Sequence, residues 1–283
     1  MSIRRLFASA LGLAALGVIG SASAASLTTS GYAENFDELG TAGTTLPTDW
    51  SLWTASGSHY SWTDANGGIP ATTSVRTVNG TANQTVNGVA QMTEIGTSTL
   101  TATTTPSGTN INGFNAAVSS SNTADRVIAT SPTSNAGEAW QLVLTNNTGA
   151  ALTGLSVSYD IDRLATGGAA DELPGYELFY SINNGSSWTN VSALNPTSAT
   201  VPNSLGVTNV SGNINFGATV ANGGTVELRW VDDNAYTASP DEILGLNNVN
   251  VAVAPVPLPA GLPLLASALG ALGLFGRRRQ QNA

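Results

Sequence analysis

A two-residue alternation of apolar and polar side chains recurs along the middle of this chain, and it limits the possible folds more than any other feature. Between residues 155 and 162, apolar residues at the odd positions alternate with Ser and Asp at the even ones. Similar apolar alternations run through residues 140–144, 176–182, 226–230 and 249–253. Successive side chains of a β-strand point to opposite faces of its sheet, so this period is typical of strands with one buried face.

Turn signals separate these segments. Residues 146–149 (Asn-Asn-Thr-Gly) follow the alternation at residues 140–144. Asn184-Gly185, a strong hairpin signal, follows residues 176–182. Thr, Ser, Asn and Gly are abundant and Lys is absent, a composition that favours strands joined by polar turns. We therefore predict an all-β fold, an antiparallel β-sandwich of the jelly-roll type.

The first 24 residues have the three parts of a secretory signal peptide. Arg4 and Arg5 give a positive start, residues 6–19 an apolar segment, and Ala22-Ser23-Ala24 a small-residue cleavage site. We expect a signal-peptide helix over residues 1–24, handled by the Sec machinery and signal peptidase. An uncleaved anchor helix is the alternative. No linker rich in Pro, Gly or Ser divides residues 25–254, so we predict one exported β-sandwich domain there.

The other end of the chain carries a second apolar segment. Residues 258–275 contain no charge, and Arg277, Arg278 and Arg279 follow almost at once. A segment of this length is about the shortest that can cross the hydrocarbon core of a membrane as a helix. Arginines beside such a segment stay in the cytoplasm. The pattern predicts a transmembrane helix over about residues 258–275 with a cytoplasmic stop; a buried helix and a plain tail anchor are the alternatives.

The residues before this segment suggest a more specific role. Val256, Pro257, Leu258, Pro259 and Ala260, followed by the apolar segment and the arginines, resemble the PEP-CTERM sorting signal of bacterial proteins processed by an exosortase. Leu258 stands where the commoner form of the motif has Glu. The resemblance implies a sorting signal over residues 255–283 and an inner-membrane-anchored intermediate. Its expected destination is the cell surface or the extracellular matrix of a biofilm.

A second resemblance covers most of the exported part. Its short motifs are similar in order to those of the concanavalin-like jelly-roll ectodomains found on exported bacterial proteins. They occupy residues 112–114, 124–128, 144–148, 155–159, 180–188, 228–230 and 246–249. The resemblance implies a jelly-roll ectodomain.

Charge and residue types exclude several functions. All nine basic residues are Arg, and five of them lie in the two terminal segments, whereas all 18 acidic residues lie in the exported part. So acidic a domain repels nucleic acid, and we expect no nucleic-acid partner. There is no cysteine, so disulfides and thiolate chemistry are excluded.

Acidic residues near the two ends of the predicted domain form a candidate calcium site. Hard cations prefer carboxylate, amide and carbonyl oxygens. The candidate ligands are Glu34, Asp37, Asp232, Asp233, Asp241 and Asn247. A solvated acidic loop is the alternative. No cofactor is required by the sequence, and a structural Ca²⁺ is the one that it favours.

Four aromatic residues near the start of the domain, Trp50, Trp53, Tyr60 and Trp62, could stack on sugar rings, or they could be core residues. Two short sequences, Asp125-Arg126 and Asp160 to Arg163, are expected to form ion pairs that pin strands.

Three functions follow from these observations. The first is a non-enzymatic structural or adhesive protein of the surface or exopolysaccharide matrix. The second is a calcium-dependent carbohydrate-binding module, with a polysaccharide as its partner. The third is a secreted hydrolase. Its Ser-His-Asp site would depend on His59, the single histidine, and no G-x-S-x-G motif occurs. We therefore expect no enzyme.

Overall fold

The structure, a computed structural model, describes the greater part of the predicted ectodomain. The described ranges are residues 23–55, 74–78, 81–86, 92–96, 100–108, 110–132, 137–166, 175–196, 200–202, 204–233 and 242–254. The predicted leader, apart from residues 23 and 24, and the predicted sorting segment at 255–283 lie outside these ranges. His59, Tyr60, Trp62 and Asp241 lie outside them too. Within these ranges no helix is long and apolar enough to cross a membrane.

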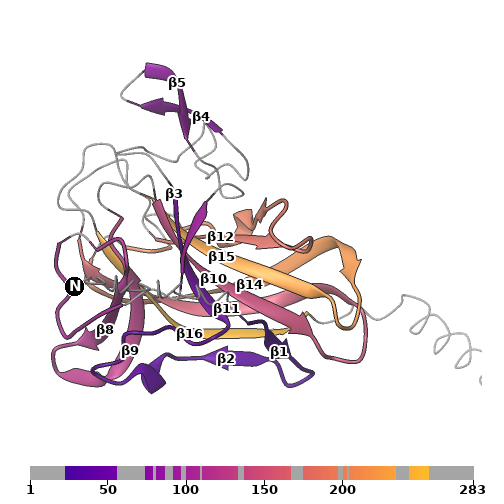
Figure 1. The fold of residues 1–283 in the computed structure, drawn as a ribbon, viewed down its shortest axis with the longest axis horizontal. Coiled ribbons are helices and arrows are strands. Elements are labelled where there is room, and N and C mark those ends of the chain that lie inside the picture. Colours follow the sequence, from indigo (N-terminus) through magenta and orange to yellow (C-terminus); the bar gives the residue numbers. More distant parts are fainter. Residues whose placement is uncertain are drawn as a thin grey trace, which may run out of the picture.

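The described chain forms two large sheets and a separate hairpin (Figure 1). The first sheet contains, in spatial order, β13 (Thr189–Asn190), β12 (Glu177–Ser181), β15 (Thr225–Asp233), β10 (Gly137–Asn146), β3 (Trp50–Ala55) and β6 (Thr93–Gly96), with β1 (Ala25–Leu27) beside β10. The second contains β14 (Gly206–Val220), β11 (Leu152–Ala165), β16 (Ile243–Val253), β9 (Asn122–Thr130), β8 (Phe114–Ser119) and β7 (Thr101–Thr103), with β2 (Tyr32–Glu34) beside β16. The hairpin pairs β4 (Ser74–Val78) with β5 (Thr81–Val86).

Antiparallel pairing dominates both sheets, as the sequence predicts. The described exceptions are the parallel pairs β1–β10 and β7–β8. Two short 3₁₀ helices interrupt the strands, η1 (Asp37–Leu39) and η3 (Ser192–Leu194). The predicted all-β sandwich is confirmed at this level.

One hydrophobic core fills the space between the sheets. The odd-numbered apolar residues of 155–161 in β11 are each at most 1% exposed and belong to this core, which confirms the face predicted from their alternation. From the first sheet, Trp50, Trp140 and Trp230 are fully buried. The ring of Trp230 stacks on Trp50 at 5.4 Å between centroids and meets the edge of Tyr159, from the opposite sheet, at 5.7 Å. Large aromatic rings therefore join the two layers.

The first two strands belong to different sheets. β1 pairs with the end of β10, whereas β2 pairs with β16 and places Glu34 opposite Val249. A bridge between Thr28 and Gly31 makes the turn between them, and Gly31 has a φ of +90°, which favours glycine. The second strand thus lies beside the last one, and residues 25–34 link both layers.

β14 forms one edge of the second sheet and is the longest described strand, with 15 residues. Its partner on one side is β11, and the ladder runs from Gly206 opposite Arg163 to Asn215 opposite Gly154. The register then shifts next to Gly217, whose φ is +64°. The straight part of this edge is therefore residues 206–215.

Candidate functional site

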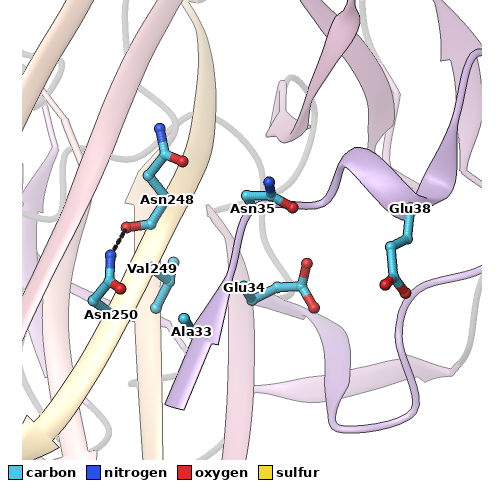
Figure 2. A pocket seen from close by; sticks show the side chains of 7 residues that line it. All are labelled: Ala33, Glu34, Asn35, Glu38, Asn248, Val249 and Asn250. Carbon is cyan, nitrogen blue, oxygen red and sulfur yellow. Dashed lines mark hydrogen bonds between the residues drawn. The ribbon is translucent and has the colours of Figure 1, made fainter. Parts of the chain in front are cut away.

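A polar pocket of about 270 Å³ lies where β2 and η1 meet β16 (Figure 2). Two carboxylates, Glu34 and Glu38, and three amide side chains, Asn35, Asn248 and Asn250, line it together with Ala33 and Val249. Glu34 accepts a hydrogen bond of 2.6 Å from the backbone N–H of Phe36, and the side chain of Asn250 donates one of 2.8 Å to the carbonyl of Asn248.

The backbone around the pocket is bent by two residues in the left-handed region. Phe36 has a φ of 61° and Asn248 a φ of 48°. Burial raises the pKa of Glu34. Carboxylate and amide oxygens around a solvent-open hollow are the donors that a hard cation or a polyhydroxylated ligand would use.

The predicted calcium ligands occupy two separate regions of the sandwich. Glu34 lies in the pocket. Close by, Asp37 accepts 2.9 Å hydrogen bonds from the backbone N–H of Arg126 and from the side chain of Asn35. Asn247 donates to Asp125 at 3.2 Å. These three predicted ligands therefore gather around β2, η1 and the start of β9.

Asp232 lies elsewhere, on the inner side of the first sheet, where Thr130 donates a 2.5 Å hydrogen bond to it. Thr130 and Asp125 are five residues apart on β9, which corresponds to about 17 Å. Asp233 ends β15, and Asp241 lies outside the described ranges. Among the described residues, no three His, Asp or Glu side chains form a group that could hold a metal.

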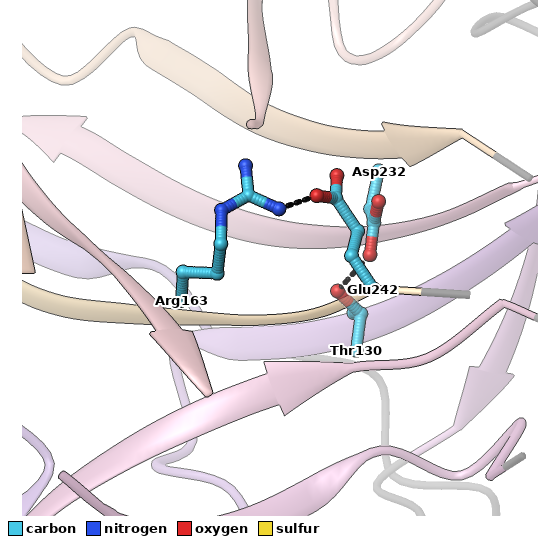
Figure 3. A network of polar contacts seen from close by, with 4 residues as sticks. All are labelled: Thr130, Arg163, Asp232 and Glu242. Atoms are coloured by element: carbon cyan, nitrogen blue, oxygen red, sulfur yellow. Dashed lines mark hydrogen bonds and ion pairs between the residues drawn. The ribbon is translucent and has the colours of Figure 1, made fainter. Parts of the chain in front are cut away.

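A buried polar network connects the two sheets at the Asp232 end (Figure 3). Arg163 on β11 forms an ion pair with Glu242, which directly precedes β16, and both side chains are at most 3% exposed. The Thr130 hydroxyl, which donates to Asp232, is also 2.9 Å from that of Tyr176, and Tyr176 donates a 2.6 Å hydrogen bond to the carbonyl of Leu244. Charged and polar groups here replace apolar packing at the end of the core.

The ion-pair partners predicted from neighbouring residues are wrong. Arg163 pairs with Glu242 and not with Asp160 or Asp162, because adjacent side chains on a strand point to opposite faces. Arg126 donates to Asn115 at 2.8 Å and to the carbonyls of Thr103, Thr123 and Asn115, whereas Asp125 binds Asn122 and Asn247. Both arginines do connect strands, as expected.

The predicted aromatic platform is divided. Trp50 is fully buried and donates a 2.8 Å hydrogen bond to Tyr32, so the prediction that it stacks on a sugar is wrong and it is a core residue. Trp53 points to the outer side of the first sheet and is half-buried. The guanidinium of Arg229 lies 4.1 Å from the ring of Trp53 and 4.1 Å from that of Trp188. One face of Trp53 is thus occupied by a cation within the protein.

Sequence reasoning did not find this Trp-Arg-Trp stack. Arg229 also donates to the side chain of Gln141, which lies opposite it in the β10–β15 register. Burial lowers the pKa of Arg229, although Glu227 and Glu94 oppose this effect. The four side chains belong to β3, β10, β15 and the loop before β13, so only the strand pairing brings them together.

Asp162 should make the stability of the domain depend on pH. It is 2% exposed, its Oδ2 has no hydrogen-bond partner among the described residues, and burial together with Asp160 and Asp125 raises its pKa to about 7. The folded state then holds a proton that the unfolded state has already lost. The stabilisation is complete below the unfolded pKa of 3.8 and disappears as the pH rises to about 7.

We expect Asp162→Asn to flatten this dependence and to raise the free energy of unfolding at pH 8 by at least about 1 kcal/mol. Urea unfolding at pH 5 and pH 8 measures both effects. Glu38→Gln, at an exposed carboxylate, is the control and should leave the slope unchanged. An identical slope in wild type and Asp162→Asn would contradict the assignment.

The fold and the two polar regions define the class of this molecule as an all-β sandwich protein with a polar surface pocket and a buried ionic network. No family model and no curated protein matches the chain. Among solved structures it is similar to one described as "Crystal structure of Agl-KA catalytic domain", with 14% sequence identity and a TM-score of 0.26. That match covers 48% of this chain and 23% of the other. A likeness of this size says nothing about the activity of this chain.

Proposed function

We propose that the chain is an exported, exosortase-sorted protein of the surface or exopolysaccharide matrix of a Gram-negative-type bacterium, with a structural or adhesive role and no enzymatic one. The observation that carries this proposal is the order of Val256 to Ala260, the uncharged segment 258–275 and Arg277 to Arg279. The leader at residues 1–24 supports it, since a sorting signal of this kind acts on exported proteins. We also propose that the sandwich is a jelly roll of the concanavalin-like kind.

The topology follows from the two ends. A signal peptide delivers the ectodomain across the membrane, and the arginines hold the far end of the apolar helix in the cytoplasm. The sandwich is then outside the membrane, tethered until the processing enzyme cuts near Pro259. The strongly acidic ectodomain is repelled by anionic headgroups, which favours its release from the membrane surface.

Deletion of residues 256–279 should abolish this sorting. We expect the full-length chain to reach the cell surface or matrix with a C-terminus near Pro259, and the deleted form to remain soluble in the periplasm or the medium. Cell fractionation with mass spectrometry of the C-terminal peptide measures both.

Two controls sharpen that experiment. Replacing Val256 to Ala260 alone should keep the membrane tether and prevent processing. Replacing three exposed residues of the ectodomain should change nothing. If the mature protein still carried Arg277 to Arg279, the C-terminal segment would be a membrane anchor that is not processed. Equal surface localisation of the deleted form would overturn the proposal.

The pocket of Figure 2 favours a second candidate, a calcium-dependent carbohydrate-binding module. On this hypothesis Ca²⁺ should raise the Tm of the protein and EDTA should reverse the shift, because a ligand that binds only the folded state stabilises it. The variant Glu34→Gln with Glu38→Gln should lose the shift, whereas Glu227→Gln on the other sheet should keep it. No calcium effect and no binding on a glycan array would remove this candidate.

A further inference from the structure

We propose that the free edge of β14, residues 206–214, pairs with the same strand of a second copy of this chain and so joins two sandwiches through one continuous sheet. The inference stands on the fold and on charge, and it does not require the sorting proposal.

β14 is an edge without the usual protection. Exposed edge strands invite pairing with other chains, and proteins guard against this with short strands, prolines or charged side chains. The other described edge strands are short: β7 has three residues, β13 two and β6 four. β14 has 15 residues and contains neither proline nor a charged residue. Its exposed side chains alternate with less exposed ones over residues 207–215, so one face of the strand is open to solvent.

The backbone along residues 206–214 is available for a new ladder. β11 occupies one side of it. Further along, Tyr180 donates a 3.1 Å hydrogen bond to the carbonyl of Asn215, and the side chain of Asn146 donates a 3.1 Å hydrogen bond to that of Val220. Described side chains thus cover the distal end of β14. At the proximal part, Leu194 of η3 packs against Gly212 and the neighbouring residues line a hollow beside residues 209–211, but no described strand pairs with β14 on the side away from β11. Two large apolar side chains mark that proximal end, Leu205 at 67% and Val207 at 55% exposed.

Charge selects a second copy as the partner. The chain carries a formal net charge of −9, yet residues 178–226 include no charged side chain at all. Two copies of an acidic protein therefore approach along this edge with the least repulsion. The nearest acidic neighbour on the outer face is Asp160 on β11, which accepts a 2.8 Å hydrogen bond from Asn209.

The distance between such carboxylates in the pair is large enough to be screened. Asp160 of one copy and that of the other would be separated by three strand spacings, about 14 Å. That exceeds the Debye length of about 8 Å at physiological ionic strength. An antiparallel pair of identical strands is also self-complementary, as a two-fold interface requires. Repulsion therefore does not oppose this pairing.

Cysteine scanning can locate the two-fold axis, because the chain has no cysteine of its own. Residues directly opposite each other in antiparallel strands have Cα atoms about 4.5–5.5 Å apart, within the range for a disulfide. Single cysteines at the exposed positions 207, 209, 211 and 213 of the full chain should give oxidised dimers with a maximum at one position and a decline away from it. Asn250→Cys, exposed on the central strand β16, is the control and should stay monomeric.

A charge variant tests the same edge without a covalent bond. Ser211→Glu with Asn213→Glu, both at exposed positions, should weaken dimerisation at least tenfold in sedimentation experiments and leave the Tm of the fold unchanged. Asn250→Glu with Ala252→Glu adds the same charge to β16 and should dimerise like wild type. A wild-type chain that is monomeric at all concentrations, or crosslinking that is equal at β14 and at Asn250→Cys, would overturn the proposal.

Discussion

Replacing Trp230 with alanine should lower the free energy of unfolding by about 3–5 kcal/mol, because it removes a large buried ring that contacts the opposite sheet. Trp230 is fully buried on β15, stacks on Trp50 and meets the edge of Tyr159 from the opposite layer. The cavity would be lined by aromatic rings held by their own strands, so the core cannot easily collapse into it. Urea unfolding followed by tryptophan fluorescence and circular dichroism measures the loss.

Leu205→Ala is the matched control for this prediction. Its side chain is 67% exposed, so truncation should change the free energy of unfolding by no more than about 0.5 kcal/mol in the monomer. A similar loss in both variants would mean that the contact between the sheets is not what Trp230 contributes.

The second large effect is expected at the buried ion pair. Arg163→Met should cost about 3–5 kcal/mol, because it leaves the carboxylate of Glu242 buried without its cationic partner. The double variant Arg163→Met with Glu242→Met removes both charges and should be less destabilised than the sum of the two single variants. Denaturant unfolding of the four proteins gives this coupling energy directly.

A half-buried carboxylate on the outer face of β11 provides the control for the ion pair. Asp160→Asn, three residues before Arg163 on the same strand, should fall within about 0.5 kcal/mol of wild type. If the two single variants at Arg163 and Glu242 were additive, the ion pair would not be the source of the stabilisation.

Local pattern was sufficient to predict the layers of this molecule. The alternation in residues 155–161 identified the buried face of β11 correctly, since the two-residue period is a property of the strand itself. The pairing of β2 with β16 brings Glu34 opposite Val249 in the last strand, which the grouping of residues from the two ends of the domain required. The alternation depends on a short segment, which a sequence displays directly.

Partners across the fold could not be predicted in this way. Arg163 and Glu242 are far apart in the chain, and only the β11–β16 pairing brings their strands together. The predicted calcium ligands were grouped because several are close in sequence or near the chain ends, but Asp232 points into the core whereas Glu34 lines a surface pocket. Trp50 and Trp53 are separated by three positions, which places them on opposite faces of β3.

The position of β16 determines how the domain responds to mechanical load. β16 pairs with β11 on one side and with β9 and β2 on the other, and the chain leaves it at Ala254 toward the C-terminal segment. Tension applied from that end acts along an interior strand, so its flanking ladders are sheared together and cannot be unzipped one hydrogen bond at a time. A protein tethered by its C-terminus would thus carry drag from flowing liquid on a strand that is hydrogen-bonded on both sides.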